Sequence, residues 1–170
     1  MPLPCLAVRV RRATVDDAGA IAEIYNRDVV ESTVTFDLVP RTLAEQRAWI
    51  TDRSGAHAAV VAIDDDDTVT GFGSLSPYRS RPAYSTTVED SVYVHRDHQR
   101  LGVGRLLLGE LVSVAQAHGF HVVIARIVGG HEASIGLHRS LGFDEVGHER
   151  EVGRKFGRWL DVVVMQRTLG

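Results

Sequence analysis

Cysteine and lysine are almost missing from this chain. Cys5 is the only cysteine, so no disulfide can form within the chain, and cysteine usage indicates no oxidising compartment. No motif surrounds Cys5, so the sequence gives no basis for a covalent thiol intermediate. Lys155 is the only lysine, and every other basic side chain is an arginine. We attribute this bias to genome composition rather than to function.

Long apolar runs are missing as well. No stretch approaches the roughly 20 residues that cross a bilayer, and residues 1–6 are too short and proline-rich for a signal peptide. The net charge of −3 gives no general reason to bind nucleic acid or an anionic membrane. We therefore expect a cytoplasmic protein with neither as a partner.

The sequence also lacks a cluster of residues with the spacing of metal ligands. His118, His121 and His131 fall on separate expected elements, and no cysteine or carboxylate stands at ligand spacing, so we expect no metal. The acidic run at residues 64–67 lies between two expected strands. It is more typical of a solvated hairpin tip than of a cation site.

Apolar periodicity predicts one domain over residues 8–170, after a loose tail at residues 1–7. Strands are expected at residues 8–11, 58–63, 68–75, 85–94, 121–128, 143–149 and 161–166, the last two joined by a glycine- and arginine-containing stretch at 153–159. Helices are expected after capping boxes at 14–17 and 42–45, from the glycine loop to His118, and over 132–141. This mixed order predicts an α+β (or mixed α/β) fold with a central sheet flanked by helices.

A glycine-spaced loop joins the 85–94 strand to the next helix. Its pattern is Gln99-x-x-Gly102-x-Gly104, with Arg100 and Arg105 adding positive charge. Glycines let a backbone approach a ligand closely, and the start of the helix offers free N–H groups to an anion. The spacing favours a phosphate-binding loop, and the alternative is a strand-to-helix turn that merely uses glycine.

With these residues the chain resembles the GNAT superfamily of acetyl-CoA-dependent N-acetyltransferases, and within it the phosphinothricin and methionine sulfoximine/sulfone acetyltransferases. The resemblance runs from about residue 9 to residue 169. It is carried by residues 24–26, 32–37, 78–84, 89–94, the glycine loop, 132–143 and 153–161. It implies a GNAT-type fold with a twisted, mostly antiparallel central sheet, acetyl transfer to the α-amino group of a small amino-acid-like acceptor, and a homodimer.

The resemblance also implies site residues. Those expected to bind acetyl-CoA are Val92, Tyr93, Val94, Gln99, Arg100, Leu101, Gly102, Val103, Gly104, Arg105, His131 and Ser134. His131 stands where many relatives have asparagine, and imidazole can also donate a hydrogen bond. Those expected to border the acceptor are Phe36, Tyr78, Arg79, Ser80, Arg81, Glu89, Asp90 and Ser91.

Two residues are the predicted catalytic groups. Glu89 is the expected base for the acceptor's ammonium group; alternatively it only binds the ammonium or pairs with Arg79 or Arg81. His138 stands where many GNAT enzymes have a tyrosine near the departing thiolate, so it is the expected proton donor or relay. The alternative is a structural histidine. For the whole protein, the alternatives are acetylation of a peptide N-terminus or another amine, and a non-catalytic acetyl-CoA sensor.

Overall fold

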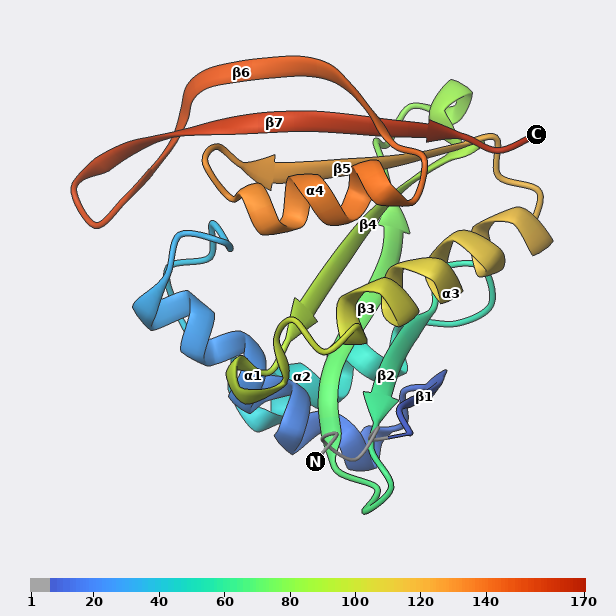
Figure 1. Ribbon diagram of the computed structural model, residues 1–170, viewed down its shortest axis with the longest axis vertical. Helices are drawn as coiled ribbons and strands as arrows, with labels where there is room; N and C mark the ends of the chain where they lie inside the picture. The colour runs from blue at the N-terminus through green and yellow to red at the C-terminus, as the bar shows by residue number, and fades with distance from the viewer. Residues whose placement is uncertain (1–6) are drawn as a thin grey trace, which may run out of the picture.

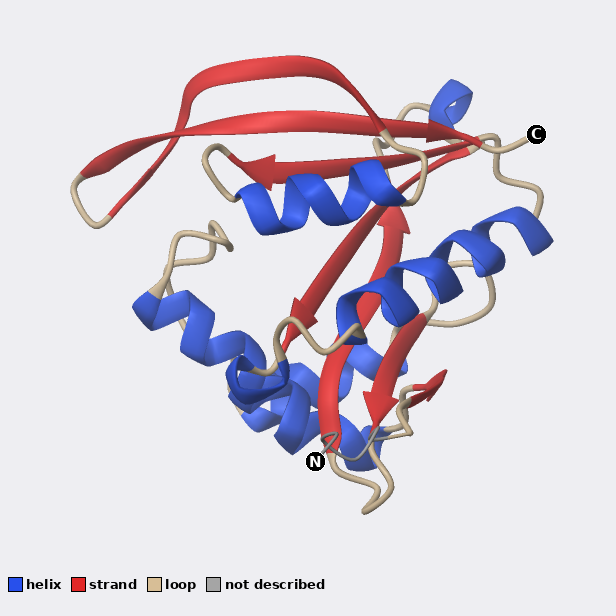
Figure 2. Ribbon diagram, viewed as in Figure 1, coloured by secondary structure: helices blue, strands red, loops and turns tan. Residues whose placement is uncertain are grey.

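The computed structural model describes residues 7–170, so the tail predicted at residues 1–7 lies, except for Ala7, outside the described residues. Figure 1 shows the elements in chain order, and Figure 2 shows helices lying against the sheet. They are β1 (Arg9–Arg12), α1 (Ala18–Glu31), α2 (Leu43–Thr51), β2 (Ala59–Ile63), β3 (Val69–Pro77), β4 (Thr87–Val94), α3 (Val103–Ala117), β5 (Val122–Val128), α4 (Glu132–Ser140), β6 (Asp144–Lys155) and β7 (Arg158–Thr168).

One seven-stranded sheet has the order β1-β2-β3-β4-β5-β7-β6. Every neighbouring pair is antiparallel except β4 and β5, which are parallel. One apolar core joins the sheet to α3 and α4, and a second joins it to α1 and α2. The predicted α+β class with a mostly antiparallel sheet is confirmed.

The two predicted capping boxes are present. Asp17 accepts a hydrogen bond from the backbone N–H of Thr14 at 2.7 Å, although a short 3-10 turn over Val15–Asp17 precedes α1. At α2, Glu45 accepts from the N–H of Thr42 at 2.7 Å and returns its own N–H to the threonine hydroxyl at 3.2 Å. Local side-chain chemistry therefore fixes where both helices begin.

Two glycines of β3 allow α3 to pack tightly on the sheet. A Cβ atom on Gly71 would lie 2.9 Å from the backbone oxygen of Tyr93 and 3.0 Å from Leu107 Cδ1. A Cβ on Gly73 would lie 3.0 Å from Leu111 Cδ1. Both glycines sit in a close approach, and the β2–β3 register also shifts beside Gly71, between Ala62 and Ile63.

The last hairpin differs from the expectation. Most of the stretch 153–159, expected to join two strands, belongs to the strands themselves: β6 runs to Lys155, β7 begins at Arg158, and only Phe156 and Gly157 form the turn, with φ of 51° and 72°. The register shifts between Glu149 and Gly153, which breaks the alternation of apolar and polar residues. Because the alternation is broken there, hydrophobic periodicity did not predict that the strand continues beyond residue 149.

Across residues 7–170, no helix has both the length and the apolar character needed to cross a membrane.

Candidate active site

The two parallel strands of the sheet separate soon after they meet. β4 and β5 pair only where Thr87–Glu89 face Val122–Ile124. Beyond that point β4 continues to Val94 on β3, and β5 continues to Val128 on β7. Figure 2 shows the two strands diverging. The β4 edge from residue 90 onward therefore has no partner strand on that side, and its backbone groups are free for an extended ligand.

The glycine loop lies at the end of the separated part of β4. Gly102 is the N-cap of α3 and has φ of 85°, which favours glycine, and Arg100 also has a positive φ of 61°. Gln99, Arg100 and Leu101 are exposed. A Cβ on Gly104 would lie 3.1 Å from Leu137 of α4, so α3 and α4 converge here. The exposed start of α3 has the local form of an anion site.

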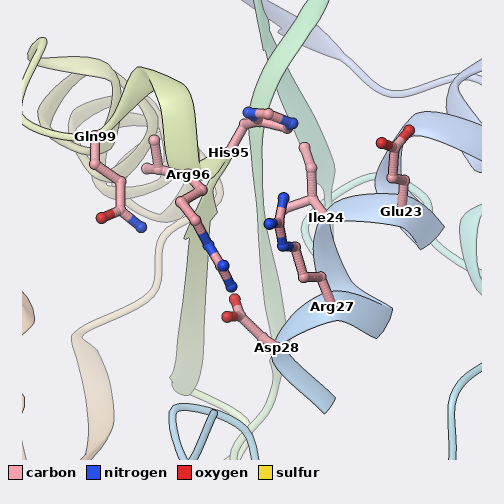
Figure 3. Close-up of a pocket in the computed structure, with 8 residues that line it drawn as sticks. Glu23, Ile24, Arg27, Asp28, His95, Arg96 and Gln99 are labelled. Atoms are coloured by element: carbon pink, nitrogen blue, oxygen red, sulfur yellow. The ribbon is translucent and has the colours of Figure 1, made fainter. Parts of the chain in front are cut away.

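On the other side of this loop a small pocket lies against α1, as Figure 3 shows. Glu23, Ile24, Arg27, Asp28, Val94, His95, Arg96 and Gln99 line it. Arg96 forms an ion pair with Glu31 at 2.7 Å. Burial raises the pKa of Asp28, and Ser32, Arg96, His131 and Lys155 oppose that rise. No motif or spacing in the sequence predicted this contact between α1 and the turn before α3.

Glu89 lies at the point where β4 and β5 part. Burial raises the pKa of Glu89, the charge of Arg126 lowers it, and the charges of Asp90 and Glu149 raise it further. Arg126 of β5 shares an ion pair with Glu149, with one contact at 3.1 Å. Arg126, rather than Arg79 or Arg81, is therefore the cation whose charge lowers the pKa of Glu89. It is the one charge in the apolar run of β5, which is a signal that could have identified it.

Asp90 turns to the opposite face of β4, as the strand alternation predicts. The resemblance grouped its side chain with the acceptor residues, but it is buried against α4, where it meets His138. His138 Nδ1 lies 2.7 Å from the backbone oxygen of Ser134, and the serine hydroxyl is 3.5 Å from the same nitrogen. His131 is half-buried and is the N-cap of α4.

The other predicted acceptor residues occupy two separate places. Tyr78 and Tyr84 meet edge to face at 5.5 Å, and the guanidinium of Arg79 lies over both rings. Ser80 and Arg81 are exposed in the same loop. Phe36 lies in the α1–α2 connection, with its ring against Gly153 of β6. Between them, Ser91 shares the face of β4 that carries Glu89.

Among the described residues, no three His, Cys, Asp or Glu side chains gather into a metal-binding group. The acidic run at 64–67 is a turn in which the Asp64 carboxylate accepts from the backbone N–H of Asp66 and Thr68. Its local role is therefore to close the β2–β3 hairpin.

The family follows from a sequence comparison. Residues 10–164 match the model of the acetyltransferase (GNAT) domain. The chain belongs to the GNAT acetyltransferases. This confirms the family that the glycine loop and its neighbouring motifs resembled.

Several GNAT relatives align over nearly the whole chain. The L-methionine sulfoximine/L-methionine sulfone acetyltransferase of Pseudomonas aeruginosa is 41% identical over 165 residues, which cover 96% of each protein. A phosphinothricin acetyltransferase from Sinorhizobium meliloti, solved in complex with AcCoA, is 40% identical with a TM-score of 0.92, covering 96% of this chain and 89% of that one. A ribosomal-protein-alanine N-acetyltransferase from Brucella melitensis is 38% identical with a TM-score of 0.92, covering 95% and 99%.

Proposed function

We propose that this GNAT protein transfers an acetyl group from acetyl-CoA to the α-amino group of a small amino-acid-like acceptor of the phosphinothricin, methionine sulfoximine or methionine sulfone type. The observation that carries the proposal is the separation of β4 from β5 directly beyond Glu89, with the glycine loop at the far end of the separated edge. Relatives of both acceptor types, each about 40% identical, support the acceptor class.

The chain's own groups fit the coenzyme. The free N–H groups at Val103 and Gly104, with the charges of Arg100 and Arg105, suit a pyrophosphate. The unpaired edge over Val92–Val94 suits the amides of the pantetheine arm, with His131 and Ser134 on the facing side. A backbone N–H on that edge can stabilise the negative charge that develops on the thioester oxygen.

Glu89 is the group that accepts the acceptor's proton. An ammonium cannot attack a thioester until it loses a proton, and a carboxylate with a raised pKa is a better base than an ordinary one. Tyr78, Arg79 and Arg81 on one side and Phe36 on the other border the acceptor. Direct attack then depends chiefly on positioning.

Thiol release from acetyl-CoA tests this proposal. The acceptors are phosphinothricin, methionine sulfoximine, methionine sulfone, ordinary amino acids and short peptides, and the variant is Glu89→Gln. We expect turnover of the first three and a loss of about 100-fold or more in kcat for the variant. Glu110→Gln, an exposed glutamate on α3, is the matched control and keeps full activity.

The competing function has one specific support, the similarity to a ribosomal-protein-alanine N-acetyltransferase. Turnover of peptides beginning with alanine, without turnover of the free amino acids, would replace the small-molecule acceptor by a protein N-terminus. Acetyl-CoA binding without any turnover would support the sensor alternative. A homodimer in the cytoplasm remains part of the proposal, and light scattering on the purified protein tests the dimer.

A further inference from the structure

A carboxylate and an imidazole face each other in the interior of this protein. Asp90 of β4 is 5% exposed and His138 of α4 is 3% exposed. Nε2 of the ring lies 3.2 and 3.3 Å from the two carboxylate oxygens. The pair lies one residue beyond the last β4–β5 pairing, on the sheet face opposite Glu89.

The hydrogen-bond partners fix the number of protons in this pair. Nδ1 of His138 lies 2.7 Å from the carbonyl oxygen of Ser134, which can only accept, so Nδ1 must carry a proton. A neutral ring would then present the lone pair of Nε2 to an ionised carboxylate. Two buried acceptors facing each other without a proton are costly. The pair therefore needs one more proton, and imidazole is the stronger base of the two.

We propose that Asp90 is a positioning residue that keeps His138 doubly protonated at neutral pH, so that the ring acts as a proton donor rather than an acceptor. The carboxylate does this through its hydrogen bond and its negative charge. Without Asp90, the same buried ring would be neutral, because burial in an apolar interior disfavours a charge.

The surrounding groups agree with this assignment. Burial by itself lowers the pKa of His138, but the hydrogen bond and charge of Asp90 and the carbonyl of Ser134 outweigh it, and the pKa is raised. His131, at the start of α4, has a pKa lowered by burial and by the nearby His138, although Asp28 opposes this. Phe143 supplies only an aromatic edge, with its ring centre 5.1 Å from that of His138.

The consequence for catalysis rests on the proposed function. The acceptor nitrogen forms a bond to the acetyl carbon, the carbon–sulfur bond breaks, and its electron pair stays on sulfur. The Nδ1 proton of His138, passed on through the hydroxyl of Ser134 at 3.5 Å, converts the thiolate to a thiol and leaves a neutral ring whose Nε2–H still donates to Asp90. Glu89 takes the proton that the nitrogen loses. Glu89 then releases its proton to water and His138 takes one up from water, which restores both groups.

Nitrogen NMR of the histidine rings tests the charge state without any acetyl-CoA or acceptor. The full chain is labelled at histidine, and His138→Gln identifies the signal among the eight histidines. At pH 7 we expect both ring nitrogens of His138 to show the closely spaced shifts of a charged ring. In Asp90→Asn we expect the widely separated shifts of a neutral ring with the proton on Nδ1.

The surface pair His148 and Asp161, 2.8 Å apart, supplies the control. Asp161→Asn changes the His148 signal and leaves His138 charged. A neutral His138 ring in the unmodified protein at pH 7 overturns the proposal, whichever variant folds. A charged ring in a protein that acetylates nothing leaves the proposal standing and contradicts only the proposed function.

The pH dependence of turnover adds a readout that a purely structural role would not move. We expect kcat of the unmodified protein to fall as pH rises through the titration of His138. In Asp90→Asn that fall moves to lower pH, with little change in the KM for acetyl-CoA. An unchanged pH profile in a folded variant would contradict the role of Asp90.

Discussion

Replacing Gly71 by alanine perturbs the contact between β3 and α3, which supports the loop proposed to bind the coenzyme. The new Cβ would lie 2.9 Å from the backbone oxygen of Tyr93, 3.0 Å from Leu107 and 3.1 Å from Val103. A backbone oxygen inside a sheet cannot move without moving its strand. Overpacking of this kind typically costs about 1–3 kcal/mol in the free energy of unfolding.

Gly109 provides a matched control on the same helix. It lies within α3, and a Cβ there meets no atom within 4 Å. Alanine in place of a glycine within a helix stabilises by about 0.5–1 kcal/mol. The same chemical change, one added methyl group, is therefore expected to lower the free energy of unfolding at Gly71, which packs against α3, and to raise it at Gly109 within α3.

Urea denaturation and thermal melting measure both changes. For a chain of this size each kcal/mol corresponds to about 2–4 °C in Tm, so Gly71→Ala lowers Tm by about 2–12 °C and Gly109→Ala raises it by about 1–4 °C. Calorimetry with acetyl-CoA should also show weaker binding to Gly71→Ala. Val103, which the new Cβ would displace, is the first residue of α3, where the pyrophosphate is proposed to bind. A Gly71→Ala protein as stable as the parent would refute the close packing.

Three other predictions test separate contacts. Gly153→Ala places a Cβ against the ring of Phe36, so the exposed ring swings away. Steady-state kinetics should then show a higher KM for the acceptor with little loss of stability. Lys155→Met removes a buried charged donor, 3% exposed, that stabilises the α1–α2 connection; urea denaturation should show a loss of about 1.5–3 kcal/mol. Burial raises the pKa of Asp17, but hydrogen bonds, chiefly from Arg11, outweigh it, so the pKa is lowered. The stability that this interaction contributes is full above about pH 4 and is lost as pH falls through the lowered pKa. Asp17→Asn should therefore flatten that part of the curve of stability against pH.

The elements that local chemistry determines could be predicted from the sequence. Capping boxes, a continuous apolar run, and a glycine loop between a strand and a helix each act within a few residues. Strand alternation also directs Glu89 and Asp90 to opposite faces of β4. The β6–β7 hairpin was predicted too short, because a register shift near Glu151 interrupts the alternation that identifies a strand.

Contacts between distant segments could not be predicted in the same way. His138 and Asp90 are 48 residues apart, and Arg126 and Glu149 are 23 apart. Their meeting depends on sheet register and on how helix α4 packs, neither of which a short window of sequence contains. As an alternative to the base role, the sequence paired Glu89 with Arg79 or Arg81 of the β3–β4 loop, whereas the cation whose charge lowers its pKa belongs to β5.

The fold explains why these charged groups gather at one level of the sheet. Parallel neighbours β4 and β5 diverge after three paired residues, so the last paired position, Glu89, is where the sheet edge opens. Alternation then directs Glu89 to one face and Asp90 to the other. A base for the amine and a proton source for the thiolate are needed on opposite sides of one reacting carbon. In the proposed mechanism two consecutive residues of one strand supply both, the second through His138.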